Sequence, residues 1–108
     1  MKLFYTPQAR GDLAELKSYI ALVLYNSQAA GEITNNLINT ISCLKQQPYM
    51  GIALAAKLRI VTDIRYLVIG KYVVFYKTVA QHIIIIRIFA GKVNYLPILL
   101  KEAERINK

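Results

Sequence analysis

Cysteine and histidine are almost absent from this chain of 108 residues, which has only Cys43 and His82. One cysteine cannot form a disulfide framework, and one of each residue cannot supply the ligands of a zinc site. The sequence also has no glycine-rich phosphate-binding loop and no serine nucleophile motif. We therefore expect neither a metal nor a cofactor, with Cys43 partly buried on a helix and His82 on the surface of a turn.

Long apolar runs and signal-like segments are absent as well. No segment approaches the roughly 18–20 consecutive apolar residues of a membrane-spanning helix, which excludes a membrane protein. The first residues continue into helix-forming sequence without the apolar block of a secretory signal. Only 3 residues are proline and 5 are glycine, whereas 56% are hydrophobic, so a disordered chain is excluded. These features predict one domain over residues 1–108, in the reducing cytoplasm.

Acidic residues are scarce, because 6 Asp and Glu accompany 14 Lys and Arg for a net charge of +8. The excess is concentrated in residues 57–92, where seven basic residues accompany Asp63 alone. Such a distribution is typical of proteins that bind a polyanion or an acidic partner protein. A solvated basic surface that maintains solubility is the alternative interpretation.

The N-terminal half of the sequence has the spacing of helices. Residues 2–5 form a short apolar run that predicts a strand, and Thr6-Pro7 then supplies a helix N-cap and a proline at the first helical position. Apolar residues recur every three or four positions over residues 9–24, which predicts an amphipathic helix. A second stripe over residues 30–44 predicts another helix, capped by Ser27. Two such helices joined by a short turn form an antiparallel hairpin.

The second half is rich in Ile, Val, Tyr and Phe, as strands are. It predicts strands at residues 64–69, 72–79 and 83–89, joined by tight turns at Gly70-Lys71 and Ala80-Gln81. The expected fold is therefore α+β. It has an N-terminal strand, an antiparallel helix hairpin packed on a three-stranded antiparallel meander, and a short C-terminal segment.

Pairing Ile69 with Tyr72 determines which residues share a face of this meander. One face is almost wholly apolar apart from Lys77 and should pack on the helix hairpin; it carries Ile64, Tyr66, Val68, Val73, Phe75, Ile84, Ile86 and Ile88. The opposite, open face carries Arg65, Leu67, Val74, Tyr76, Ile85 and Arg87. The pattern thus predicts two arginines and a tyrosine on one exposed sheet face.

The candidate site is an array of basic side chains and one tyrosine: Lys57, Arg59, Arg65, Arg87, Lys92 and Tyr95. A guanidinium can neutralise charge that develops on a pentacoordinate phosphate, and a tyrosine or lysine can move protons. RNA cleavage by attack of a 2′-hydroxyl therefore needs no metal. The same residue types can also hold single-stranded bases by stacking, so composition does not separate catalysis from binding. Tyr95 can instead pack its ring between the sheet and the C-terminal segment.

Several short motifs occur along the chain in a particular order. They are residues 4–9 (FYTPQA) leading into Asp12-Leu13 and Tyr19-Ile20, residues 47–51 (QPYMG), residues 64–77 (IRYLVIGKYVVFYK), residues 86–92 (IRIFAGK) and Asn94-Tyr95. In this order and spacing, the sequence resembles the RelE/ParE superfamily of bacterial toxins from type II toxin–antitoxin modules. The resemblance covers essentially the full length of the chain.

The resemblance implies a small basic toxin held inactive by a cognate antitoxin protein in a heteromeric complex. An acidic antitoxin would be steered to the basic face, and could pair with a sheet edge or lie along the helix hairpin. RelE-like members cleave mRNA in the ribosomal A site, so the ribosome and mRNA would be further partners of a metal-independent endoribonuclease. On this interpretation the catalytic residues are Arg65, Arg87 and Tyr95, and the RNA-binding residues are Lys57, Arg59 and Lys92.

Two alternatives accompany this main interpretation. ParE-like members inhibit DNA gyrase and lack the ribonuclease residues. The long helix hairpin and the strand over residues 72–76 are ParE-like, and the Glu and His acid–base pair of some ribonuclease members has no counterpart here. A gyrase inhibitor should depend on helix or C-terminal surface residues such as Lys101 and Arg105. The other alternative is a non-enzymatic, antitoxin-binding protein whose toxicity has decayed.

Overall fold

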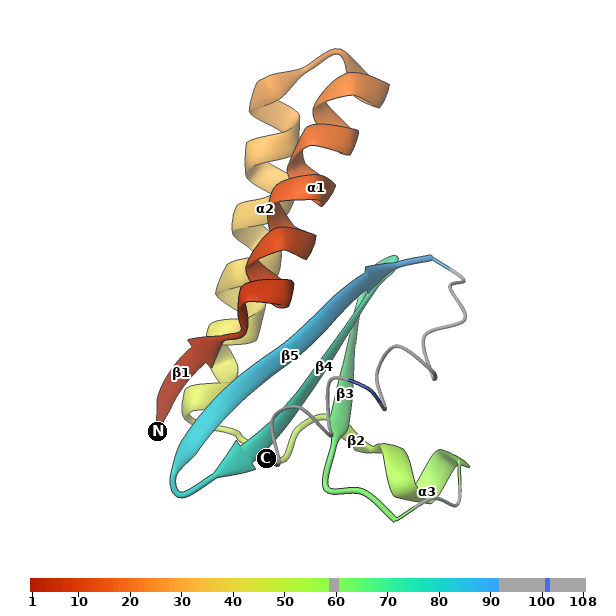
Figure 1. Ribbon diagram of the computed structural model, residues 1–108. Coiled ribbons are helices and arrows are strands. Elements are labelled where there is room, and N and C mark those ends of the chain that lie inside the picture. Colours follow the sequence, from red (N-terminus) through yellow and green to blue (C-terminus); the bar gives the residue numbers. More distant parts are fainter. Residues whose placement is uncertain (59–60, 92–100, 102–108) are drawn as a thin grey trace.

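The computed structural model describes residues 1–58, 61–91 and 101 of the chain. The predicted C-terminal segment lies outside these residues. The described part forms a layer of two long helices against one sheet of five strands (Figure 1). None of its helices has both the length and the apolar character needed to cross a membrane.

The elements follow one another in the expected order, with two additions. They are β1 (Lys2–Tyr5), α1 (Pro7–Leu24), α2 (Ser27–Ser42), a 3₁₀ turn (Cys43–Lys45), β2 (Ile52–Ala53), α3 (Leu54–Leu58), β3 (Arg65–Ile69), β4 (Tyr72–Val79) and β5 (His82–Ala90). Neither β2 nor α3 is expected from the sequence, because both are too short to show a hydrophobic period.

The sheet is mixed, with strand order β1-β5-β4-β3-β2. The predicted meander of three strands is its centre, and β1 extends it by pairing in parallel with the first residues of β5. On the other side, β2 pairs antiparallel with β3. The prediction of a three-stranded sheet is therefore too small, since pairing between distant segments leaves no local pattern in the sequence.

Polar side chains fix where the two helices begin. The Thr6 hydroxyl accepts a hydrogen bond from the backbone N–H of Ala9 at 3.0 Å and donates one to the carbonyl oxygen of Ile86 at 2.8 Å. This confirms Thr6 as the N-cap of α1 and also ties the helix to β5. The N-cap of α2 is Asn26 rather than the predicted Ser27, because the Asn26 carboxamide oxygen accepts from the N–H of Ala29.

Both predicted two-residue turns of the meander are present. Gly70 has a φ of 60°, which a residue without a Cβ adopts at little cost. The second turn uses Ala80 and Gln81, with φ of 48° and 65°, although neither is glycine. Positive φ at both central residues is the geometry that matches the right-handed twist of a hairpin.

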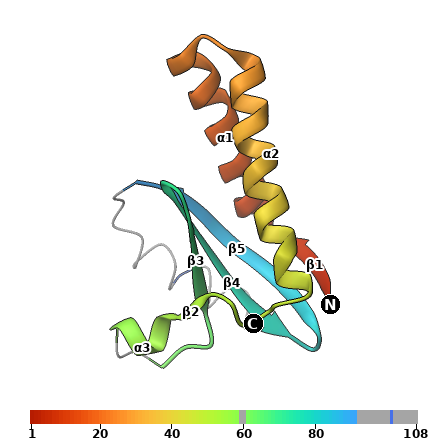
Figure 2. The same cartoon turned by 180° about the vertical axis from the view of Figure 1, so that it is seen from behind.

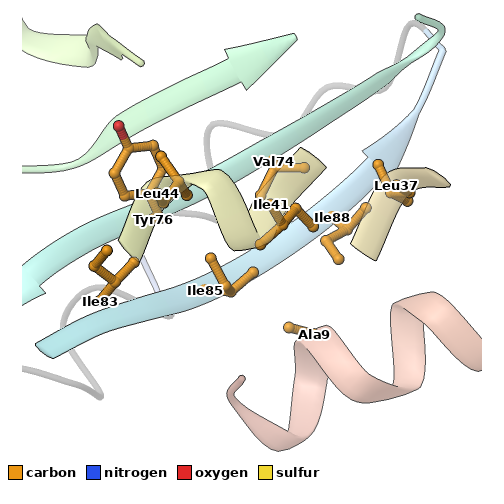
Figure 3. Packing of buried hydrophobic residues seen from close by; sticks show 9 residues of the cluster. All are labelled: Ala9, Leu37, Ile41, Leu44, Val74, Tyr76, Ile83, Ile85 and Ile88. Atoms are coloured by element: carbon orange, nitrogen blue, oxygen red, sulfur yellow. The ribbon is translucent and has the colours of Figure 1, made fainter. Parts of the chain in front are cut away.

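The helix hairpin covers the face of the sheet that the sequence analysis left open. The predicted pairing of β3 with β4 is confirmed, since Ile69 lies opposite Tyr72. The main core nevertheless joins both helices to the supposedly exposed face (Figure 3) and comprises Ala9, Leu37, Ile41, Leu44, Val74, Tyr76, Ile83, Ile85 and Ile88. The prediction was wrong because both faces of the sheet are apolar, so alternation alone does not indicate which one the helices cover.

The face predicted to pack on the helices belongs to a second, smaller core. Its buried members are Leu54, Ile64, Tyr66, Phe75, Ile86 and Phe89, with Leu54 supplied by α3. Lys77, whose position opposite Ile84 places it on the same face as Phe75, is buried, with 3% of its surface exposed.

A β-bulge interrupts the pairing of β4 with β5. Phe75 lies opposite Arg87, but the next residue of β4, Tyr76, lies opposite Ile85, so Ile86 is the extra residue. The bulge brings Ile85 and Ile88 to the helix-covered face and leaves Arg87 opposite Phe75 on the other face. A strictly alternating strand does not produce this arrangement.

Candidate functional site

Arg65, at the start of β3, holds the loop that follows α2. Its Nη1 donates a hydrogen bond to the carbonyl oxygen of Gly51 at 2.8 Å, and its guanidinium lies 5.0 Å from the centre of the Tyr49 ring. Stacking of a guanidinium on an aromatic ring is a favourable cation–π contact. The arginine is thus partly buried in contacts within the chain.

Tyr76, directly opposite Arg65 on β4, holds the same loop from the core. Its hydroxyl accepts a hydrogen bond from the backbone N–H of Gly51 and donates one to the carbonyl oxygen of Pro48, both at 2.9 Å. The ring is fully buried against Leu44 and Ile83 (Figure 3). The proline-containing loop is therefore pinned to the sheet by two side chains, Arg65 and Tyr76.

Arg87 makes a two-point ion pair with α1. Its Nε and Nη2 donate to the two carboxylate oxygens of Asp12 at 2.8 and 2.9 Å. One of these oxygens also accepts the backbone N–H of Ile88 at 2.9 Å. The side chains of Arg87 and Asp12 are only 18% and 12% exposed, and the guanidinium lies 4.9 Å from the Phe89 ring. Asp12 thereby supplies a hydrogen-bond acceptor to the edge of β5 beyond the end of β1, at the N–H of Ile88. The same carboxylate holds α1 against β5.

Arg65 and Arg87 do not form the single array that the sequence predicts. They lie on strands separated by β4, opposite two consecutive residues of it, Tyr76 and Phe75. Because consecutive residues of a strand point to opposite faces, the two arginines belong to opposite faces of the sheet. The expectation of an open face with two arginines and a tyrosine is therefore wrong, and the β-bulge beside Arg87 is the physical reason.

The other predicted site residues are only partly described. Lys57, on α3, is exposed, and its ammonium lies 5.5 Å from the centre of the Tyr66 ring. Arg59, Lys92 and Tyr95 lie outside the described residues, as does Arg105. Their expected roles stay predictions.

The single histidine and the single cysteine of the chain, His82 and Cys43, are both exposed. His82 lies at the start of β5, as expected for a residue at a turn, with its ring edge-on to Phe4 at 5.2 Å. Cys43 is exposed in the 3₁₀ turn, whereas the sequence predicts a partly buried thiol. The helical spacing places Leu44, not Cys43, in the core. In the described ranges, no three His, Cys, Asp or Glu side chains gather as metal ligands would.

An open groove runs beside the Asp12–Arg87 pair, between α1 and the second half of β5. It is lined by Asp12, Glu15, Leu16, Tyr19, Arg87, Ile88, Phe89 and Ala90. Asp12 is a member of this region that the sequence pattern did not predict. The signal that could have found it is its place three residues after the buried Ala9, on the side of α1 that faces the sheet.

Replacing Tyr76 by phenylalanine tests how firmly the loop is pinned. Without the hydroxyl, the N–H of Gly51 and the carbonyl of Pro48 lose their partner, and we expect a loss of about 2 kcal/mol in the free energy of unfolding. Urea unfolding of Tyr76→Phe and of Tyr49→Phe, a control on an exposed ring, measures the effect. Equal stabilities of the two variants would contradict the assigned contacts.

Stability should also fall at high pH because of Tyr76. Burial raises the pKa of its hydroxyl above the ordinary value of 10.0, and the Gly51 N–H and the Arg65 charge only partly oppose this. The unfolded chain therefore ionises at Tyr76 first as the pH rises, which favours unfolding above about pH 10. We expect the stability difference between the native protein and Tyr76→Phe to narrow between pH 9 and pH 11, as urea unfolding across that range would measure. A constant difference would contradict this assignment.

Comparisons with known proteins place the fold. The profile of the family described as "ParE toxin of type II toxin-antitoxin system, parDE" matches residues 3–95. A chain of the solved structure described as the "Chromosomal ParDE TA system from P. aeruginosa" is similar, with a TM-score of 0.71 over 85% of this chain and 97% of that chain, at 20% identity. No curated protein matches the sequence significantly.

The α+β arrangement of an N-terminal strand, two helices and a mixed five-stranded sheet thus matches the fold of that ParDE chain. Because the family profile covers most of its length, the chain belongs to the ParE toxin family of type II toxin–antitoxin systems.

Proposed function

We propose that this chain is a growth-inhibiting toxin that is neutralised by a ParD-type antitoxin and that acts on DNA gyrase rather than on mRNA. The observation that carries the choice of target is the engagement of both predicted catalytic arginines in contacts within the chain. The membership of the ParE family supports the same choice, since gyrase inhibition is the activity that the resemblance attached to ParE-like members.

A catalytic arginine must present its guanidinium to a phosphate. Arg87 would first have to leave Asp12, and a carboxylate that is only 12% exposed would then lose its partner. Breaking an ion pair of this kind costs several kcal/mol, of the order of 3. Arg65 would likewise give up the Gly51 carbonyl. Their opposite faces also prevent both arginines from meeting the same phosphate without a rearrangement of the sheet.

The antitoxin is expected to be acidic. A net charge of +8 steers an acidic chain to the toxin and raises its association rate at low salt. The similar solved structure is described as a ParDE TA system, which supports a ParD-type partner for this chain. We propose that the pair acts in the cytoplasm, where a toxin of this kind would meet its target.

Primer extension on an mRNA in a reconstituted translation reaction tests this proposal. The purified protein should leave the mRNA intact, with and without ribosomes, although its expression in cells arrests growth. New cuts inside codons that require ribosomes would overturn the choice of target and restore the ribonuclease interpretation. Absence of growth arrest would leave only the non-enzymatic, antitoxin-binding protein.

A conservative substitution separates the structural from the catalytic role of Arg87. Lysine keeps a cation beside Asp12 but cannot reproduce the fork of two hydrogen bonds that a guanidinium makes. On the proposed function, Arg87→Lys should retain growth arrest on induced expression. If growth recovers while thermal unfolding shows a folded protein, the guanidinium has a direct role in toxicity.

A further inference from the structure

The loop end of the helix hairpin exposes an unusual amount of apolar surface. Four side chains, here named the tip patch, are Tyr19, Leu22, Val23 and Tyr25, with exposed fractions of 66%, 71%, 55% and 93%. Tyr19, Leu22 and Val23 have the spacing that places residues on one side of a helix, and Tyr25 follows at the C-cap of α1. A contiguous exposed apolar patch of this kind marks an interaction site.

The shape of the molecule leaves the tip patch accessible. In both views, the ends of α1 and α2 that meet at residues 25–26 extend beyond the sheet (Figures 1 and 2). Neither of the two cores includes any of the four side chains. The patch therefore lies on a projecting pair of helices, where a partner meets it without contacting the described strands.

The tip is also the least charged part of a strongly basic chain. Residues 18–31 contain no charged side chain, although the protein carries +8. The charges that flank this segment are of mixed sign: Glu15 and Lys17 on α1, and Glu32 on α2. An acidic partner or a nucleic acid would be drawn instead to the positive residues of the second half of the chain.

We propose that the tip patch binds the tip patch of a second copy of this chain, so that the free toxin is a twofold dimer joined through its hairpins. Two copies with +8 each repel one another, and a contact at the uncharged tip keeps this repulsion smallest. In a twofold contact each surface meets itself, so rim charges of both signs can pair across the interface. Two helix hairpins packed together form a four-helix arrangement, which is a stable packing solution.

The exposed area of the tip patch reaches the lower limit for such a dimer. A tyrosine side chain can bury of the order of 150–250 Å². Two largely exposed tyrosines with Leu22 and Val23 therefore offer about 500 Å² per copy, or about 1,000 Å² in a symmetric contact. A specific interface should bury at least about 1,000 Å² in total, so the tip patch reaches the area of a small interface between two copies.

Sedimentation of the purified full chain tests the dimer. We expect a dimer at micromolar concentration, and a dissociation constant raised at least tenfold by Leu22→Glu, because this variant places two like charges at the centre of the contact. Ala14→Glu adds the same charge to an exposed position of α1, roughly 140° around the helix from Tyr19, and should leave the dimer intact. Circular dichroism confirms that both variants fold.

Salt provides a second readout. Screening weakens the repulsion between the two basic chains and leaves apolar contacts in place, so the dimer should strengthen between about 50 and 500 mM salt. A monomer at every concentration, or a dimer that Leu22→Glu does not weaken, would overturn the proposal. If the chain is monomeric but Leu22→Glu abolishes binding of the antitoxin or of gyrase, the patch belongs to that partner instead. These outcomes are independent of whether the toxin acts on gyrase.

Discussion

Replacement of Gly51 by alanine is expected to lower the free energy of unfolding by about 3 kcal/mol or more, or to prevent folding. A Cβ at this position would lie 2.6 Å from the Tyr76 hydroxyl oxygen, 2.7 Å from Tyr76 Cε1 and 2.8 Å from the backbone oxygen of Tyr66. These distances are far inside van der Waals contact. Tyr76 is fully buried and Tyr66 contributes backbone, so neither neighbour moves cheaply, and overpacking of this kind costs a few kcal/mol.

Gly31→Ala is the matched control for this experiment. Nothing lies within 4 Å of a Cβ built at Gly31, which is an interior residue of α2. Alanine there should raise stability by about 0.5–1 kcal/mol, because glycine is the poorer helix former. Urea unfolding of both variants measures the difference. Similar stabilities of Gly51→Ala and Gly31→Ala would show that the loop is not held against Tyr76.

The second large effect is expected at Asp12. Removing its carboxylate in Asp12→Ala leaves the Arg87 guanidinium and the N–H of Ile88 without the acceptor that they share. Breaking a buried ion pair by removing one partner costs about 3–5 kcal/mol. Since the two side chains retain 18% and 12% exposure, we expect a loss near the lower end, about 3 kcal/mol.

A double-mutant cycle isolates this interaction. Asp12→Ala, Arg87→Ala and the double variant should show a coupling of at least about 1.5 kcal/mol in their unfolding free energies. Glu15→Ala removes an exposed carboxylate from the same helix and should change stability by less than about 0.5 kcal/mol. Additive effects in the cycle would mean that the ion pair does not hold α1 to β5.

Most of the fold could be predicted from the sequence because its signals are local. The N-cap at Thr6, the stripes of both helices and the turn at Gly70 each specify the conformation of a few neighbouring residues. The pairing of β3 with β4 could be predicted from the tight turn that joins them, because this turn sets the register of all residue pairs of the two strands.

The errors come from interactions between distant parts of the chain. Both faces of the sheet are apolar, so the alternation of side chains did not reveal which face the hairpin covers. The bulge at Ile86, opposite Phe75 and Tyr76, has no signature in the sequence, yet it moves Arg87 to the face opposite Arg65. The ion pair of Arg87 with Asp12 joins residues 75 positions apart, and spacing along the chain does not predict such a contact.

The sequence therefore predicted which residue types form the candidate site, but not how their side chains are arranged in space. Arg65 and Arg87 are both present in the sheet, as expected. The guanidinium of Arg65 donates to the Gly51 carbonyl of a distant loop. The guanidinium of Arg87 donates to the Asp12 carboxylate on α1. The number of basic residues indicates a positive surface. It does not distinguish a guanidinium that is available to bind a phosphate from one that stabilises the fold through contacts within the chain.

The most direct test of the proposed target is a DNA gyrase supercoiling reaction with the purified protein, compared with the same protein premixed with its antitoxin. We expect the toxin to inhibit supercoiling and the antitoxin to restore it. We also expect a folded Arg87→Lys variant to inhibit supercoiling as strongly as the native protein does. Unimpeded supercoiling at toxin concentrations well above that of gyrase, by a protein that still arrests growth, would contradict the account.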